Sequence, residues 1–98
     1  MQSKKYISIK QFCEKHDIEE SFVLVLQEYE LLQLQFKKQE AMVHYEELPL
    51  LEKMVRLHQE LHINPEGLQV VNQLLQQVYQ LQQEVTLLRQ KLDLFDDL

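Results

Sequence analysis

The segment from residue 68 to residue 98 contains neither proline nor glycine, and its large apolar residues are spaced alternately three and four apart. The residues that follow this spacing are Val71, Leu74, Val78, Leu81, Val85, Leu88, Leu92 and Phe95. The spacing is that of the a and d positions of a coiled coil, in which one face of a long helix packs against another helix. The pattern therefore predicts a long C-terminal helix.

A helix of about 30 residues is roughly 45 Å long, and a small domain cannot cover all of that length. The part of the helix beyond about Val78 is therefore expected to pack against another chain, and we predict a homodimer. The pattern itself leaves the orientation of the two helices open. The residues expected to form this contact are here called the dimer seam: Val78, Leu81, Val85, Leu88, Leu92 and Phe95.

The clearest boundary in the chain lies just before this helix, at residues 64–67, which read Asn-Pro-Glu-Gly. Asparagine is a favoured N-cap residue, and proline is favoured at the first position of a helix. Asn64 and Pro65 therefore predict the start of the long helix. We divide the chain into an N-terminal domain of residues 1–63 and a dimerisation helix of residues 64–98.

The N-terminal domain is expected to be mainly helical, with one small β-hairpin. Ser8 is the expected N-cap of the first helix, which places Ile9, Phe12 and Cys13 on one face. The run from Phe22 to Leu26 is rich in β-branched residues and could form a strand, but its polar flanks favour a helix. The expected elements are helices over about 9–16, 19–29 and 46–62 and strands over 32–36 and 41–45.

Apolar residues at helical spacing predict which faces of the second and third helices point inward. In the second helix these are Phe22, Val23 and Leu26, with Tyr29 as a further candidate. The expected apolar stripe of the third helix consists of Leu48, Leu51, Met54 or Val55, Leu57 or His58, and Leu61.

The second helix and its flanks are acidic. Residues 17–32 contain no lysine or arginine, and the carboxylates there are Asp17, Glu19, Glu20, Glu28 and Glu30. The whole chain has a formal net charge of -6 at pH 7. Because DNA affinity comes largely from lysine and arginine side chains that neutralise phosphates, we expect no nucleic-acid partner. The same charge argues against an anionic membrane surface.

A candidate binding face lies on this acidic helix. Glu20, Leu24, Gln27 and Glu28 are neighbours at helical spacing, and Leu24 is an apolar residue among acidic ones. One interpretation is an ordinary solvated helix face. The other is a docking surface for a basic protein, because opposite charges speed association and fix the register of two partners.

Several patterns bear on catalysis and cellular location. Cys13 is the single cysteine, so it forms no internal disulfide, which fits a reducing cytoplasm; its apolar neighbours predict a buried thiol. His58 and His62 have the spacing of metal ligands on a helix, but no third ligand is evident nearby. There is no phosphate-binding glycine loop and no nucleophile elbow. We expect a cytoplasmic protein without enzymatic activity, metal or cofactor, and no membrane span or secretory signal.

The order of these elements resembles the MerR-type winged helix-turn-helix family. The residues that carry the resemblance are Ile7–Ile9 at the first helix, Leu31 and Leu32 after the second, Tyr45–Leu48 at the third, and Leu57–Asn64 before the fourth. The resemblance implies a mainly α winged helix-turn-helix fold with a long coiled-coil helix, and an antiparallel dimer. DNA-contacting positions of that family correspond here to Ser21, Leu24, Val25 and Leu26, and a family glycine corresponds to Glu30.

Within that superfamily the chain is most similar to the chaperone-modulator (CbpM-type) proteins. The matching segments are Tyr6–Ile9 with Phe12 and Cys13, Arg56–Leu61 with Asn64 and Gly67, and Leu87–Leu92. This resemblance implies an adaptor that binds the J-domain of a DnaJ-type co-chaperone and inhibits its work with the DnaK-type chaperone.

Two other functions remain open. One is a MerR-type transcriptional regulator, and the lysines that could contact DNA are Lys4, Lys5, Lys10, Lys37 and Lys38. The other is a structural protein that assembles through the dimer seam. Salt-dependent binding to duplex DNA would indicate the regulator, and self-association without any other partner would indicate the structural protein.

Overall fold

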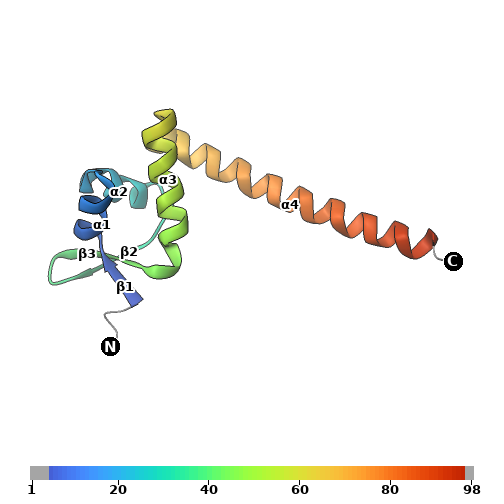
Figure 1. Cartoon of the computed structure of the whole chain (residues 1–98), viewed down its shortest axis with the longest axis horizontal. Coiled ribbons are helices and arrows are strands. Elements are labelled where there is room, and N and C mark those ends of the chain that lie inside the picture. The colour runs from blue at the N-terminus through green and yellow to red at the C-terminus, as the bar shows by residue number, and fades with distance from the viewer. Residues whose placement is uncertain (1–4, 97–98) are drawn as a thin grey trace.

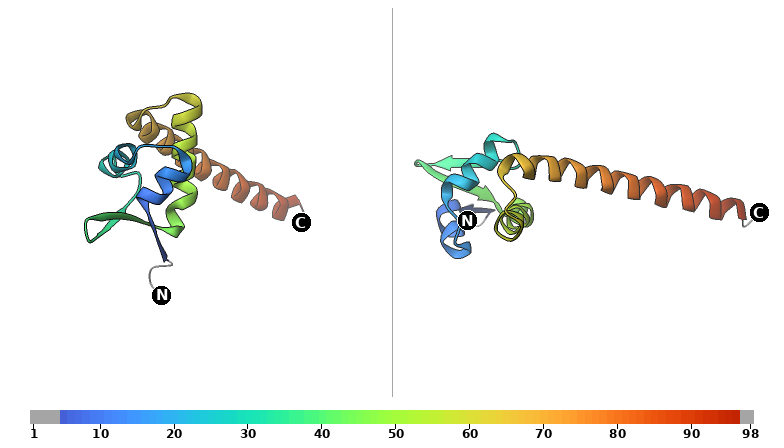
Figure 2. Two further views of the ribbon diagram at one scale, coloured as in Figure 1. Left: turned by 60° about the vertical axis from the view of Figure 1, so that its left-hand side comes forward. Right: turned by 90° about the horizontal axis from the view of Figure 1, so that it is seen from above.

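A small helical domain and one projecting helix make up the structure, a computed structural model that describes residues 5–96 (Figure 1). The elements follow the order β1, α1, α2, β2, β3, η2, α3 and α4. The fold is the expected mainly helical winged helix-turn-helix with a small sheet and a long C-terminal helix. The molecule measures 63 × 36 × 21 Å, and α4 accounts for most of its length (Figure 2).

Helices α1 (Ile9–His16) and α2 (Glu20–Glu28) form the helix-turn-helix unit. Ser8 is the predicted N-cap, since its Oγ accepts a hydrogen bond from the backbone N–H of Gln11 at 3.4 Å. Asp17 has a left-handed backbone that ends α1 and turns the chain toward α2. The alternative of a strand over the run from Phe22 to Leu26 is wrong, because these residues lie within α2. Of the predicted inward residues, Phe22, Val23 and Leu26 are buried, and the further candidate Tyr29 is half-buried directly after α2.

The sheet has three strands instead of the predicted two. Strands β2 (Leu34–Lys37) and β3 (Glu40–His44) form the expected hairpin. The additional strand β1 (Tyr6–Ser8) pairs antiparallel with β3, so the order is β1-β3-β2. Strand β1 is only three residues long, which is too short for a period-two pattern to reveal it in the sequence.

The 3₁₀ turn η2 (Tyr45–Glu47) leads into helix α3 (Leu48–Leu61). Leu51, Met54 and Val55 are buried on α3, as its apolar stripe predicted. The prediction for Leu61 is wrong, because this residue is 63% exposed. Directly after Leu61, the left-handed backbone of His62 turns the chain away from the helix. Ile63 then packs against the core in place of Leu61.

One hydrophobic core joins the helices to the sheet. Its buried members come from α1, α2, the α2–β2 loop, the sheet, α3 and the first turn of α4. Leu68 of α4 is fully buried, so the start of the long helix belongs to the core although the predicted boundary lies before it. The other members are Ile9, Phe12, Cys13, Phe22, Val23, Leu26, Leu31, Leu32, Leu34, Val43, Leu51, Met54 and Val55.

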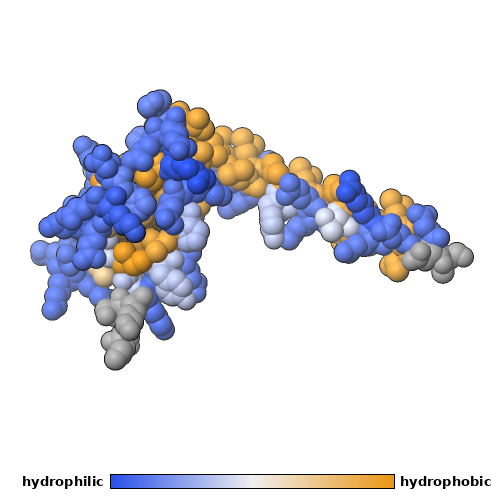
Figure 3. All heavy atoms as spheres, viewed as in Figure 1, coloured by the Kyte–Doolittle hydropathy of each residue, from blue (hydrophilic) through white to orange (hydrophobic). Residues whose placement is uncertain are grey.

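Helix α4 (Pro65–Asp96) leaves the domain as a single unbroken helix (Figures 1 and 2). Asn64 acts as the predicted cap, because its Oδ1 accepts a hydrogen bond from the backbone N–H of Gly67 at 2.7 Å. Apolar side chains cover one side of the helix where it leaves the domain (Figure 3). Across residues 5–96, no helix is long and apolar enough to cross a membrane.

Candidate functional site

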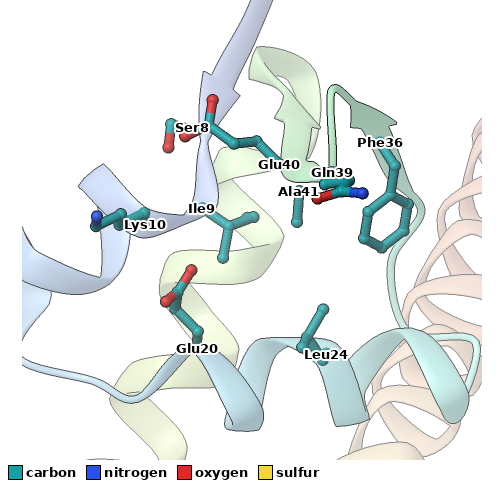
Figure 4. A pocket seen from close by; sticks show the side chains of 9 residues that line it. All are labelled: Ser8, Ile9, Lys10, Glu20, Leu24, Phe36, Gln39, Glu40 and Ala41. Carbon is teal, nitrogen blue, oxygen red and sulfur yellow. The ribbon is translucent and has the colours of Figure 1, made fainter.

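A cavity of about 300 Å³ lies between the start of α1, the exposed side of α2 and the β2–β3 hairpin (Figure 4). Its size is at the lower end of the roughly 300–1,000 Å³ found for small-molecule sites, and it suits a single side chain better than a large cofactor. The residues that line it are Ser8, Ile9, Lys10, Glu20, Leu24, Phe36, Gln39, Glu40 and Ala41.

The apolar part of the cavity comes from α1, α2 and both strands of the hairpin. Leu24 points up from α2 and Phe36 comes from β2 opposite it, while Ile9 begins α1 and Ala41 belongs to β3 (Figure 4). Leu24 is 39% exposed and Phe36 is 58% exposed, whereas Ile9 is fully buried. Two large apolar side chains therefore border a solvent-accessible hollow with an apolar floor.

The charged part of the cavity contains two carboxylates and one ammonium group. Glu20 projects from α2 and Glu40 from the start of β3, both on the side of the cavity away from Phe36 (Figure 4). Lys10 lies at the edge, and its side chain extends away from Leu24 (Figure 4). Two negative charges against one positive charge give the lining a formal charge of minus one.

The hairpin turn brings Gln39 and Glu40 to this cavity. Lys38 and Gln39 both have positive φ angles, 51° and 69°. Two successive left-handed residues form the type of tight turn that matches the twist of a hairpin, usually with asparagine or glycine. The close β2–β3 pairing, with Phe36 opposite Ala41, thus places residues of both strands beside α2.

The structure brings two of the four predicted face residues to the cavity. Glu20 and Leu24 line it. Gln27 is half-buried and Glu28 is exposed at the end of α2, and neither is part of the lining. The sequence pattern did not identify Phe36 or Glu40 as site residues, because Phe36 ends one expected strand and Glu40 lies between the two expected strands.

The predicted dimer seam is exposed along its whole length in the single chain. The exposed fractions of its side chains range from 46% for Val85 to 72% for Phe95. Val71, one heptad before the seam, is half-buried. The domain therefore covers the first part of the apolar stripe of α4 and leaves the remainder uncovered.

The side chains of His58 and Cys13 pack within the domain. The His58 ring stacks on Phe22 with the ring centroids 4.2 Å apart, and its Nδ1 lies 2.8 Å from the carbonyl oxygen of Ile63. In the part of the chain that the structure describes, no three His, Cys, Asp or Glu side chains are grouped to hold a metal ion. Cys13 is 4% exposed, and its burial, together with the charge of Glu20, raises the pKa of the thiol to about 11.

The lysines considered for DNA contact are dispersed. Lys10 borders the cavity, and the Nζ atom of Lys37 lies 5.2 Å from the centre of the Tyr6 ring. Lys38 is exposed at the hairpin turn and Lys5 is exposed before β1. Lys4 lies outside the described residues. None of these lysines belongs to α2, which contains no lysine or arginine.

Comparison with known proteins identifies one family. A family model described as MerR HTH family regulatory protein matches residues 7–90, which includes every helix and strand except the end of α4 and the start of β1. No curated protein and no solved structure matches the chain.

Proposed function

The chain belongs to the MerR HTH family of regulatory proteins, and from that premise we propose that it is a non-enzymatic adaptor for a J-domain co-chaperone. In this proposal it binds the J-domain of a DnaJ-type protein and inhibits the work of that protein with the DnaK-type chaperone. The proposal rests on the resemblance of the sequence to chaperone modulators and on the character of α2 and the cavity beside it.

The observation that carries the proposal is the replacement of a DNA-contacting helix surface by an acidic and apolar one. The exposed face of α2 presents Glu20 and Leu24 to the cavity and Glu28 to solvent, without a basic residue. A helix of this kind repels phosphates, since DNA binding depends on neutralising them with lysine and arginine. It is suited to a positively charged protein surface.

The cavity favours a helical, basic partner over a flat one. Leu24 and Phe36 form an apolar anchor point, and Glu20 and Glu40 flank it with negative charge. In protein interfaces a few buried apolar contacts supply most of the affinity, and surrounding charges steer association. A J-domain presents a basic helix beside the loop that engages the chaperone, and such a helix complements this surface.

We further propose that two copies pair through the dimer seam, antiparallel as the resemblance implies. When all six seam residues are paired, Glu84 of each copy faces Lys91 of the other along one edge of the contact. Shifting this antiparallel register by one heptad would instead bring Glu84 to Glu84 or Lys91 to Lys91, and like charges are unfavourable. The implied layers are Val78 with Phe95, Leu81 with Leu92, and Val85 with Leu88 of the second copy.

The functional test is the ATP hydrolysis of a DnaK-type chaperone stimulated by the DnaJ-type co-chaperone encoded beside this protein or in the same genome. Adding the protein should lower the stimulated rate in proportion to J-domain occupancy and leave the unstimulated rate unchanged. A stimulated rate that does not change when the protein is in excess over the co-chaperone would refute the proposed function.

A further inference from the structure

We propose that the cavity between α2 and the hairpin is a receptor for one arginine side chain of the basic partner. This inference rests on the proposed function for the partner's identity, but the chemistry of the cavity carries it. The four residues that define this arginine receptor are Glu20, Leu24, Phe36 and Glu40.

The arrangement of the lining separates an apolar half from an acidic half. Leu24 and Phe36 lie on one side, and Glu20 and Glu40 lie on the other, across the buried Ile9 (Figure 4). Long basic side chains are themselves divided in this way, because an apolar stem carries a charged head. The stem would lie against Leu24, and the head would lie between the Phe36 ring and the two carboxylates.

The lining favours a cation over a neutral apolar side chain. Its two carboxylates exceed its one ammonium group by a single negative charge, and the Lys10 side chain extends toward the edge. A cationic guest would balance this charge. A leucine or methionine guest would cover the apolar half but would leave both carboxylates less hydrated without giving them a partner.

The lining also favours arginine over lysine. The guanidinium group is planar, can stack on the exposed ring of Phe36, and offers five N–H donors in a fixed geometry. Glu20 reaches the cavity from α2 and Glu40 from β3, so this fork of donors can meet carboxylate acceptors from two elements. The compact ammonium group of lysine has three donors and cannot stack in the same way.

The test uses single amino-acid probes and does not require the co-chaperone. N-acetyl-arginine methylamide, N-acetyl-lysine methylamide and N-acetyl-leucine methylamide are titrated separately into the full ¹⁵N-labelled protein. The arginine probe should give saturable amide shifts at Leu24, Phe36 and Ala41. Its half-saturation should need about threefold less probe than that of lysine, as expected for one exposed cation–π contact.

Variants of the lining locate the effect. Phe36→Leu should reduce the preference for arginine over lysine, and Glu20→Gln should weaken binding of both cations. Glu28→Gln is the matched control, because Glu28 is an exposed glutamate of the same helix outside the lining. Equal binding of the lysine or leucine probe, or equal effects of Glu20→Gln and Glu28→Gln, would overturn the proposal.

The outcomes separate this proposal from the function on which it rests. If the arginine probe binds in the cavity but the J-domain does not bind the protein, the receptor stands and the partner is wrong. If the J-domain binds but the arginine probe gives no saturable shifts in the cavity, the adaptor function stands and the receptor is wrong.

Discussion

The Asn64 side chain and the Gly67 backbone together begin the long helix, with the Asn64 Oδ1 atom 2.7 Å from the Gly67 nitrogen. A Cβ atom added at Gly67 would lie 2.8 Å from the Cγ2 of Ile63 and 3.2 Å from the same Oδ1. The cap is thus built around a residue without a side chain. This is also where the chain turns from α3 into α4 and Leu68 enters the core.

Both residues are therefore expected to contribute to stability. Asn64→Ala removes the cap and should lower the free energy of unfolding by about 1 kcal/mol.

Gly67→Ala should also destabilise the protein, although alanine is ordinarily the better helix former, because its Cβ forces Ile63 to move. Urea unfolding at one protein concentration measures both, with Gln76→Ala on the exposed part of α4 as the control. A Gly67→Ala variant more stable than the original protein would show that the close approach is unimportant.

Cys13 gives a prediction for pH. Burial first, and the Glu20 charge second, raise the pKa of the folded thiol from 9.0 to about 11. The folded chain therefore holds this proton more tightly than the unfolded chain. The stability that results is fully present below pH 9 and is lost as the pH rises from 9 toward 11. Alkylation by iodoacetamide should accordingly be slow in the folded protein at pH 9 and fast in urea, and equal rates would contradict the burial of Cys13.

Residues with long, regular patterns allowed most of the fold to be predicted. The helix faces containing Phe22, Leu26 and Leu51 followed from apolar spacing, and the start of α4 followed from Asn64 and Pro65. The third strand was missed, because three residues are too few to show a period. Leu61 was misassigned, since helical spacing alone does not reveal that His62 turns the chain.

The candidate site was only half predictable for a related reason. Helical spacing identifies neighbours on one helix, so it could group Glu20 with Leu24. It cannot show that the hairpin lies over α2, and therefore it could not add Phe36 or Glu40. Glu30, the position at which the resemblance implies a family glycine, has a φ of 60°, in the left-handed region that glycine adopts most easily.

Pairing through α4 is tested by placing charge in the dimer seam. Leu81→Asp combined with Leu88→Asp should convert a dimer into a monomer, because a paired seam would bury carboxylates without partners. Light scattering at micromolar concentration reads out the mass directly. The matched control is Gln76→Asp with Gln90→Asp, which adds the same charge to exposed positions of α4 outside the heptad seam. A monomeric original protein at this concentration would contradict the dimer.

The acidic helix gives a negative prediction for DNA. We expect no sequence-specific binding to duplex DNA at physiological salt, where specific binders reach about 10⁻⁸ M or tighter. A mobility-shift assay with the region upstream of the protein's own gene provides the test, with a non-specific duplex as competitor. A shifted band at nanomolar protein that survives the competitor would instead support the transcriptional regulator, with contacts through Lys10, Lys37 and Lys38.

Calorimetric titration of the purified J-domain tests whether the surface beside Leu24 binds it. The original protein should bind, and Leu24→Arg should abolish binding, because it places a cation at the anchor point of a site for a basic partner. Gln35→Arg adds the same charge on the hairpin outside the cavity lining and should leave binding unchanged, and circular dichroism should show both variants folded. If Leu24→Arg binds the J-domain as tightly as the original protein does, the surface beside Leu24 is not the binding site.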